Sequence, residues 1–178
     1  MKTLVMLHGP PAAGKTTLAL KLVIKALDRG LNATYAPEWI KDYANRKYQI
    51  NNLVDSAGVV GNQMMEINHA IDADYEFIVS CSSPALCTFY ANYYSNNSWL
   101  SLIPMVKEWE HNVMSKGYTI FSPAIYLDQE EYRTRFNNRG RYEDFETCLK
   151  LQEALKSYLR INFNIDSHSG DVLKDILS

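Results

Sequence analysis

One stretch near the start of the chain has residue types and spacing that suit phosphate chemistry. It runs from Gly9 to Thr16, reads GPPAAGKT, and fits the pattern G-x-x-x-x-G-K-[ST] at every position. In such a loop glycines let backbone N–H groups turn towards a β-phosphate, Lys15 reaches the β- and γ-oxygens, and the Thr16 hydroxyl ligates Mg²⁺. We therefore expect ATP and Mg²⁺ as cofactors, with Thr16 as the metal ligand and Lys15 as a catalytic residue. The expected nucleotide contacts are Gly9, Pro10, Ala12, Ala13, Gly14, Lys15, Thr16 and Thr17.

The sequence on both sides of this loop supports that interpretation. Thr3–His8 reads as a short buried strand, and apolar residues recur at helical spacing from Thr17 to Asp28. Gly30 follows where a glycine commonly ends a helix. A strand, a glycine-rich loop and a helix in this order direct the helix N-terminus at the phosphates. The context therefore favours a phosphate-binding loop over a chance match in a turn.

Strand and helix candidates alternate along the whole chain. The predicted strands are Thr3–His8, Asn32–Ala36, Glu76–Ser80, Tyr118–Leu127 and Arg160–Ile165. The predicted helices are about Lys15–Asp28, Trp39–Arg46, Asp55–Ala73, Pro84–Tyr94, Leu102–Lys116, Glu130–Phe136, Tyr142–Tyr158 and Gly170–Leu177. This alternation predicts an α/β fold with a five-stranded, mostly parallel sheet and helices on both faces. Together with the loop Gly9–Thr16, this arrangement resembles the P-loop NTPase three-layer sandwich. Ligands of such sheets bind beyond the carboxyl ends of the strands, so the residues after each strand are the candidates for function.

Length and composition narrow the class of protein. The 178 residues suit a single domain, residues 1–178, and exclude a large multidomain motor. A net charge of −2 provides no global basic field for nucleic acid, so any DNA contact would need a local patch. Three cysteines without C-x-x-C spacing, no signal-peptide pattern and no apolar run long enough for a bilayer indicate a reducing compartment without membrane contact. We expect a cytoplasmic protein.

The second predicted strand ends in an acid and a large aromatic residue, Glu38 and Trp39. A carboxylate at this strand end would face the phosphate loop, which makes Glu38 the best candidate for a general base on an acceptor hydroxyl. The alternative for Glu38 is a first-turn acid that interacts with a helix dipole. Trp39 either stacks on an acceptor base or packs at the start of the next helix.

These features resemble the P-loop kinases of small molecules, in particular the deoxynucleoside, thymidylate and ribosylnicotinamide kinase group. The resemblance covers most of the chain and rests on the loop Gly9–Thr16, on Glu38 with Trp39, on Gln63, and on the arginine-rich segment Arg133–Arg141. It implies that Glu38 acts as base on a sugar hydroxyl and that Gln63 reads a nucleobase edge. An amide can do so because it offers donors beside an acceptor. The alternative for Gln63 is a solvated helix residue.

The end of the third predicted strand departs from that family pattern. Most relatives carry an acid there that holds Mg²⁺ directly or through water, whereas this chain has Ser80–Ser83, which reads SCSS. Because Mg²⁺ retains several waters, Thr16 and the triphosphate oxygens would suffice, or Glu38 serves the metal instead of the acceptor. Cys81 lacks a histidine in a recognisable partner motif, so a buried thiol is favoured over a nucleophile.

Arginines cluster after the fourth predicted strand. Arg133, Arg135, Arg139 and Arg141 lie in a segment, about 128–142, that also contains asparagines and a glycine. Guanidinium groups match phosphate oxygens bidentately, so this segment is predicted to be a lid that closes over the transferring phosphoryl group. Arg139 and Arg141 are the predicted catalytic arginines, and Arg133 is a predicted substrate contact. A solvated basic turn is the alternative.

An aromatic helix face follows the third predicted strand. It consists of Phe89, Tyr90, Tyr93 and Tyr94. At helical spacing such a face is typical of a core. The alternative is a wall on which an acceptor base, or a base extruded from nucleic acid, would stack.

Together these features favour an ATP- and Mg²⁺-dependent kinase that transfers the γ-phosphoryl group to a hydroxyl of a nucleoside- or nucleotide-like acceptor. A second hypothesis is a kinase that acts on a modified base in DNA, such as the phage-type enzymes that phosphorylate hydroxymethyluracil, a hydroxymethylpyrimidine, within DNA. A third is a P-loop ATPase or nucleotide-binding switch, which the missing acid at 80–83 supports and the absence of an N-K-x-D motif opposes. The oligomeric state is open, with a homodimer as one option.

Overall fold

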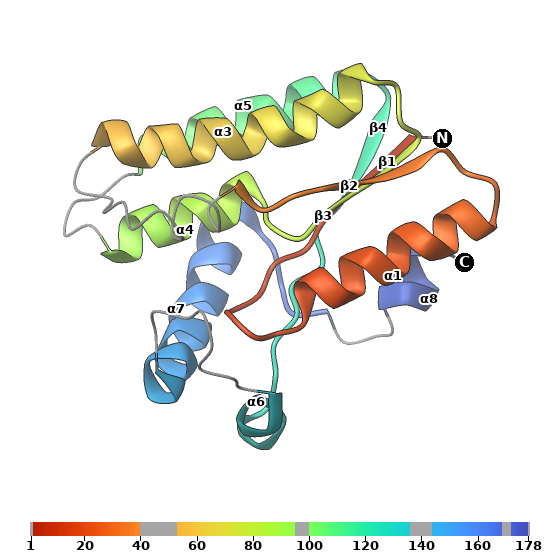
Figure 1. The fold of residues 1–178 in the computed structure, drawn as a ribbon. Helices are drawn as coiled ribbons and strands as arrows, with labels where there is room; N and C mark the ends of the chain where they lie inside the picture. The colour runs from red at the N-terminus through yellow and green to blue at the C-terminus, as the bar shows by residue number, and fades with distance from the viewer. Residues whose placement is uncertain (1, 40–52, 95–99, 136–143, 169–171, 178) are drawn as a thin grey trace.

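In the computed structural model the chain is described at residues 2–39, 53–94, 100–135, 144–168 and 172–177 (Figure 1). Strands and helices alternate, as the sequence predicted. The strands are β1 (Lys2–Met6), β2 (Ala33–Ala36), β3 (Phe77–Ser80) and β4 (Tyr118–Phe121). The helices are α1 (Lys15–Asp28), α3 (Leu53–Asp72), α4 (Pro84–Tyr94), α5 (Leu102–Ser115), α6 (Gln129–Arg135), α7 (Phe145–Phe163) and α8 (Val172–Leu177).

The four strands form one parallel sheet in the order β2-β3-β1-β4. β1 lies inside the sheet, where Thr3 pairs with Phe77 of β3 and with Thr119 of β4. Four of its five residues are buried, and the last three, Leu4, Val5 and Met6, are apolar, as expected of a parallel strand that is covered on both faces. The loop after β1 therefore leaves the sheet between the carboxyl ends of β3 and β4.

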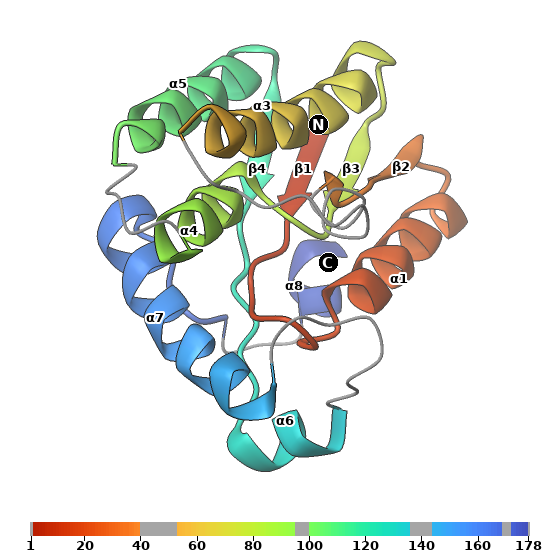
Figure 2. The ribbon, with the colours of Figure 1, turned by 60° about the vertical axis from the view of Figure 1, so that its left-hand side comes forward.

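Helices cover both faces of this sheet (Figures 1 and 2). On one face α1 and α8 pack against Val5 and Val79, and on the other face α3 and α5 pack against Leu4 and Ile78. The faces alternate along each strand because successive side chains point in opposite directions. The predicted three-layer sandwich is thereby confirmed. None of the helices in the described ranges is long and apolar enough to cross a bilayer.

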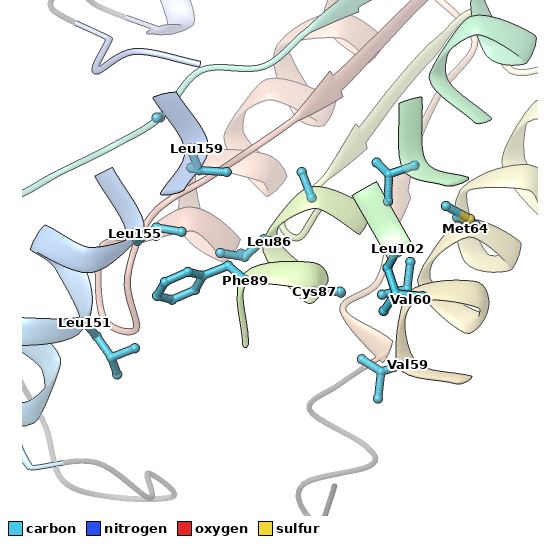
Figure 3. Close-up of a cluster of buried hydrophobic side chains, with 13 residues drawn as sticks. Val59, Val60, Met64, Leu86, Cys87, Phe89, Leu102, Leu151, Leu155 and Leu159 are labelled. Atoms are coloured by element: carbon cyan, nitrogen blue, oxygen red, sulfur yellow. The ribbon is translucent and has the colours of Figure 1, made fainter. Parts of the chain in front are cut away.

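A further apolar cluster places α4 between α3 and α7 (Figure 3). Leu86 and Phe89 of α4 share this cluster with Met64 of α3 and with Leu155 and Leu159 of α7. Burial of apolar surface contributes about 25 cal/mol per Å² to stability, so this cluster holds α4 firmly. Because α4 begins just after β3, the cluster also fixes the chain at the carboxyl edge of the sheet.

The fifth predicted strand, Arg160–Ile165, is wrong. α7 continues through Phe163 and ends at Asn164, which adopts a left-handed conformation with φ 55°. The apolar residues of this segment alternate as they would in a strand, which explains the prediction. Leu155 and Leu159 are buried one helical turn apart, however, and this buried face continues the helix into the segment.

The fourth predicted strand, Tyr118–Leu127, is shorter than expected. β4 stops before Pro123, which has no N–H to donate to the ladder. Beyond it Ala124 makes single parallel bridges, one with His8 and one with Ser167. The bridge to Ser167 is the contact that takes the place of a fifth strand.

Gly30 ends α1 as predicted. It has φ 78°, and its N–H donates to Leu27 O at 2.8 Å while Leu31 N–H donates to Ala26 O at 3.1 Å. These two bonds form a Schellman motif, which satisfies carbonyls that the helix end would leave without partners. The motif directs the chain from α1 into β2.

Candidate active site

The loop between β1 and α1 has a backbone conformation that its glycines permit. Gly9 has φ 150° and Gly14 has φ 81°, backbone angles that residues with a side chain rarely adopt. A Cβ at Gly9 would lie 2.4 Å from the carbonyl oxygen of Ile125, so only glycine fits there without a shift of the backbone. Gly14 is the N-cap of α1 and provides no capping side chain. The first turn of α1 can therefore receive an anion where a capping residue would otherwise lie.

The ammonium group of Lys15 lies inside this loop. It is buried and donates to the carbonyl oxygens of Gly9 and Pro10, each at 2.9 Å. The first turn of α1 contains no acidic residue. A buried cation beside a helix N-terminus concentrates positive potential at one point. The loop is therefore suited to bind phosphate groups.

A buried tyrosine joins the phosphate loop to α6. Tyr132 is completely buried, and its hydroxyl donates to the carbonyl oxygen of Pro11. Its ring packs in a small apolar cluster with Ala13, Leu127 and Cys148. Because α6 is the first helix of the predicted lid segment, this contact anchors the start of that segment directly on the loop.

Gln63 fixes the chain that follows β2. Its Oε1 accepts from the N–H of Trp39 at 3.0 Å, and its Nε2 donates to Pro37 O at 3.1 Å and to Ser80 Oγ at 3.3 Å. The side chain is fully buried. Glu38 lies between the two residues that Gln63 holds. Both amide hydrogens are used within the protein, so these contacts give Gln63 a positioning role and provide no support for the predicted reading of a nucleobase edge.

Glu38 lies at the carboxyl edge of the sheet, as predicted. Burial is the main cause of the raised pKa of Tyr35 and of Cys87, and the negative charge of Glu38 raises both further. Tyr35 belongs to β2 and Cys87 to α4, so the carboxylate acts on groups from two elements that border this edge. Glu38 is half-buried, which leaves part of its side chain accessible to an acceptor.

Tyr35 is a functional candidate that the sequence analysis missed. Its hydroxyl lies 2.8 Å from Cys81 Sγ and within hydrogen-bonding reach of the Thr16 hydroxyl. Burial and the contact with Cys81 raise the pKa of Tyr35, so the phenol is neutral at physiological pH. The phenol of Tyr35 therefore links the Thr16 hydroxyl to the thiol of Cys81, which follows β3 at the point where the sequence lacks an acid.

The donor atoms around Thr16 fit a metal that arrives with a nucleotide. Among the described residues, no group of three or more His, Cys, Asp or Glu side chains is placed to hold a metal ion. Mg²⁺ prefers hard oxygen donors, keeps several waters, and is commonly held by one or two protein groups together with substrate phosphates. Thr16 beside the phosphate loop matches that pattern.

The serines at the end of β3 and just after it form hydrogen bonds within the protein. Ser80 Oγ donates to Ser82 O at 2.5 Å. Ser83 Oγ accepts from Leu86 N–H at 2.9 Å and lies 2.7 Å from Nε2 of His8. Because Ser83 Oγ already accepts a bond, its own proton is available for Nε2, which suits a neutral imidazole. These contacts hold the end of β3 against the residue that precedes the phosphate loop.

His8 gives a prediction for stability against pH. Burial, with a smaller contribution from the charge of Lys15, lowers the pKa of His8 to about 4. The folded state therefore keeps the imidazole neutral while the unfolded state takes up a proton below its ordinary pKa of about 6.5. As the pH falls from about 6.5 to about 4, we expect the free energy of unfolding to fall by about 3 kcal/mol through this group alone.

Urea unfolding of the wild type and of His8→Gln across this pH range measures the effect. The variant has no imidazole, so its free energy of unfolding should fall less steeply, while both proteins share the contribution of the carboxyl groups. Equal slopes would show that His8 does not resist protonation in the folded state.

The aromatic residues divide into a buried and an exposed part. Phe89 is buried and lies edge-on to Tyr90, with ring centroids 5.3 Å apart. Trp39 packs against the cluster of Figure 3 and is half-buried. Tyr93 and Tyr94 are 39% and 48% exposed at the end of α4. The core interpretation therefore applies to Phe89, whereas the two outer tyrosines are available at the surface.

The arginines are only partly described. Arg133 lies on α6 with its guanidinium carbon 5.6 Å from the centre of the Phe145 ring, and its side chain is exposed. Arg139 and Arg141 lie outside the described residues, as does most of the predicted helix Trp39–Arg46. The predicted roles of all three arginines stay predictions.

Comparison with known proteins gives a likeness in fold. No family model matches the chain, and no curated protein matches its sequence. Among solved structures, deoxyadenosine kinase from M. mycoides, with bound dATP, is 14% identical with a TM-score of 0.54, over 98% of this chain and 97% of that chain. The structure of APE1195 is 16% identical with a TM-score of 0.51, over 99% and 90%. APS kinase CysC from Mycobacterium tuberculosis is 12% identical with a TM-score of 0.47, over 85% and 94%.

The first two similarities extend over nearly the whole chain. At such low identity they define the fold alone, which this chain shares with deoxyadenosine kinase. The described sheet has four parallel strands rather than the predicted five. The P-loop kinase fold predicted from Gly9–Thr16 is thus confirmed, while membership of the deoxynucleoside kinase subgroup stays a prediction.

Proposed function

We propose that the protein is an ATP- and Mg²⁺-dependent kinase that phosphorylates a hydroxyl of a nucleoside- or nucleotide-like acceptor. The observation that carries this proposal is the placement of Glu38 at the end of β2. The side chain of Gln63 is hydrogen-bonded to Pro37 and Trp39, the residues on both sides of Glu38. The negative charge of Glu38 acts on Tyr35, whose hydroxyl lies within hydrogen-bonding reach of Thr16. A carboxylate held near a phosphate loop serves phosphoryl transfer to an acceptor better than nucleotide binding alone.

Each residue has a defined task in this reaction. Lys15 and the N–H groups at the start of α1 bind the phosphates and neutralise their charge. Glu38 accepts the proton of the acceptor hydroxyl while the oxygen of that hydroxyl bonds to the γ-phosphorus. The bond from the γ-phosphorus to its bridging oxygen breaks, and ADP leaves. Mg²⁺, when bound by Thr16 and the triphosphate, supplies charge neutralisation of the β- and γ-oxygens.

Tyr35 orients the Thr16 hydroxyl in this proposal, because the chain has no acid at residues 80–83 to do so. A phenol beside Thr16 can hold the threonine hydroxyl with its lone pair towards the metal, although it adds no negative charge. We expect Tyr35→Phe to raise the Mg²⁺ concentration needed for half-maximal nucleotide binding by about fivefold, since one hydrogen bond contributes about 1 kcal/mol. Titration of Mg²⁺ with a fluorescent ATP analogue measures this.

Tyr75→Phe is the matched control for that titration, because Tyr75 precedes β3 at the opposite edge of the sheet. It should leave the Mg²⁺ requirement unchanged. An unchanged requirement in Tyr35→Phe as well would remove Tyr35 from the metal site.

The acceptor class is tested with a panel of acceptors. Free nucleosides, nucleotides, ribosylnicotinamide and DNA that contains hydroxymethyluracil are each incubated with labelled ATP. We expect a free nucleoside or nucleotide to be labelled, with little dependence on salt, because the chain carries a net charge of −2.

DNA is the second candidate acceptor, and Tyr93 and Tyr94 are the observation that favours it. These exposed rings at the end of α4 could stack on an extruded base. Labelling of DNA with a steep loss of binding as salt rises would select this candidate over the free acceptor.

A further inference from the structure

The solvent side of α1 carries a row of large apolar side chains that the fold of the monomer does not use. Leu20, Ile24, Leu27 and Leu31 are 46%, 57%, 51% and 37% exposed, and these fractions include the cover that α8 provides. The spacing of Leu20, Ile24 and Leu27 by four and three residues places them along one side of the helix, and Leu31 follows the turn at Gly30 that ends it. We call this row the α1 stripe.

A separate face of α1 forms the contact with the sheet. Ala19, Leu22, Val23 and Ala26 are buried there, in the cluster with Val5 and Val79. The helix therefore has apolar residues on two sides, and only one side is needed to attach it to the sheet. Exposed apolar residues that gather on one surface, with charged residues along the rim, are typical of protein contact sites.

The charges that border the α1 stripe make it complementary to itself. Lys21 and Asp28 are both exposed and are seven residues apart, which is two helical turns, so they lie on the same flank of the stripe. Neither has an ion-pair partner among the described residues. If two such helices pack antiparallel, with Ile24 of each opposite Leu27 of the other, Lys21 of each lies beside Asp28 of the other. In a parallel pair the two-fold axis would place the charged flanks of the two copies on opposite sides of the interface, so Lys21 and Asp28 would not meet.

We propose that the α1 stripe is the interface of a homodimer in which two copies of α1 pack antiparallel about a two-fold axis. The apolar row supplies the affinity, and the two Lys21–Asp28 pairs select the antiparallel register, which is the usual contribution of rim charges. Each α1 starts at its phosphate loop, so the two loops lie at opposite ends of the helix pair. Both sites stay open to nucleotide in this arrangement.

Sedimentation equilibrium of the whole chain tests the interface. We expect the wild type to show a mass of twice the 20.4 kDa of one chain, and Ile24→Glu to show the monomer mass. Circular dichroism checks that the variant is folded, and Met114→Glu is the matched control, because Met114 is 50% exposed on α5. A wild type that is monomeric throughout the concentration range would overturn the proposal.

A charge swap distinguishes this dimer from any other association. Lys21→Glu alone and Asp28→Lys alone should each raise the dimer dissociation constant by about tenfold. Each change converts both Lys21–Asp28 pairs across the interface into pairs of like charge, because both copies carry it. The double variant Lys21→Glu with Asp28→Lys restores both pairs and should return the dissociation constant to that of the wild type. Single variants without effect, or a double variant that stays weakened, would exclude the antiparallel α1 pair.

Discussion

Glu38→Gln should bind ATP as tightly as the wild type and transfer the γ-phosphoryl group about a hundredfold to ten-thousandfold more slowly. The amide keeps the shape of the side chain and loses the ability to accept the proton of the acceptor hydroxyl, and general-base catalysis contributes about this much. The backbone at position 38 stays in place in the variant because the side chain of Gln63 is hydrogen-bonded to the neighbours on both sides, Pro37 and Trp39. The change should therefore act on turnover and leave affinity intact.

Single-turnover transfer and equilibrium ATP binding, measured on the same preparation, separate these two effects. Glu108→Gln is the matched control, because it makes the same chemical change on the exposed surface of α5. Equal turnover in the wild type and in Glu38→Gln would remove Glu38 from the proton-transfer step. Loss of ATP binding in Glu38→Gln would assign the carboxylate to the metal instead.

Lys15→Met should lower turnover by at least about a hundredfold and also weaken nucleotide binding. The ammonium is buried and donates to the loop carbonyls of Gly9 and Pro10, so its positive charge lies inside the loop, next to the phosphates that the loop would bind. Methionine keeps a flexible side chain of similar length and removes the charge that neutralises the β- and γ-oxygens. Binding and turnover should fall together, in contrast to Glu38→Gln.

Lys25→Met is the control for that variant, since Lys25 is exposed on the same helix. Isothermal titration with ATP measures the affinity, and thermal unfolding without nucleotide checks the fold. If Lys15→Met bound and turned over ATP like the Lys25→Met control, the loop would not be the phosphate site.

The sequence predicted the parts of the site that depend on local pattern. The loop Gly9–Thr16 can be recognised in the sequence because its backbone conformation needs glycine at defined positions. The bounds of α1 and α4 also match the prediction. The failed strand at Arg160–Ile165 shows the limit of periodicity, because a short apolar alternation fits both a strand and the end of a helix.

The contacts of Tyr35 and Gln63 depend on long-range packing and could not be read from the sequence. Tyr35 meets Thr16 and Cys81 only because β2 lies beside β3 and α1 crosses their ends. A signal for Tyr35 existed, since alternation in β2 places it on the α1 face of the sheet. Nothing in the sequence around Gln63 indicated that its amide bonds to the backbone beside Glu38.

The most direct test of the central claim follows the γ-phosphoryl group of labelled ATP in the presence and absence of acceptor. Phosphoryl transfer predicts that the label appears on an acceptor hydroxyl, that its appearance requires Mg²⁺, and that little is released as inorganic phosphate. Release of the label as inorganic phosphate at the same rate with and without acceptor, from protein that binds ATP normally, would contradict a kinase and identify an ATPase.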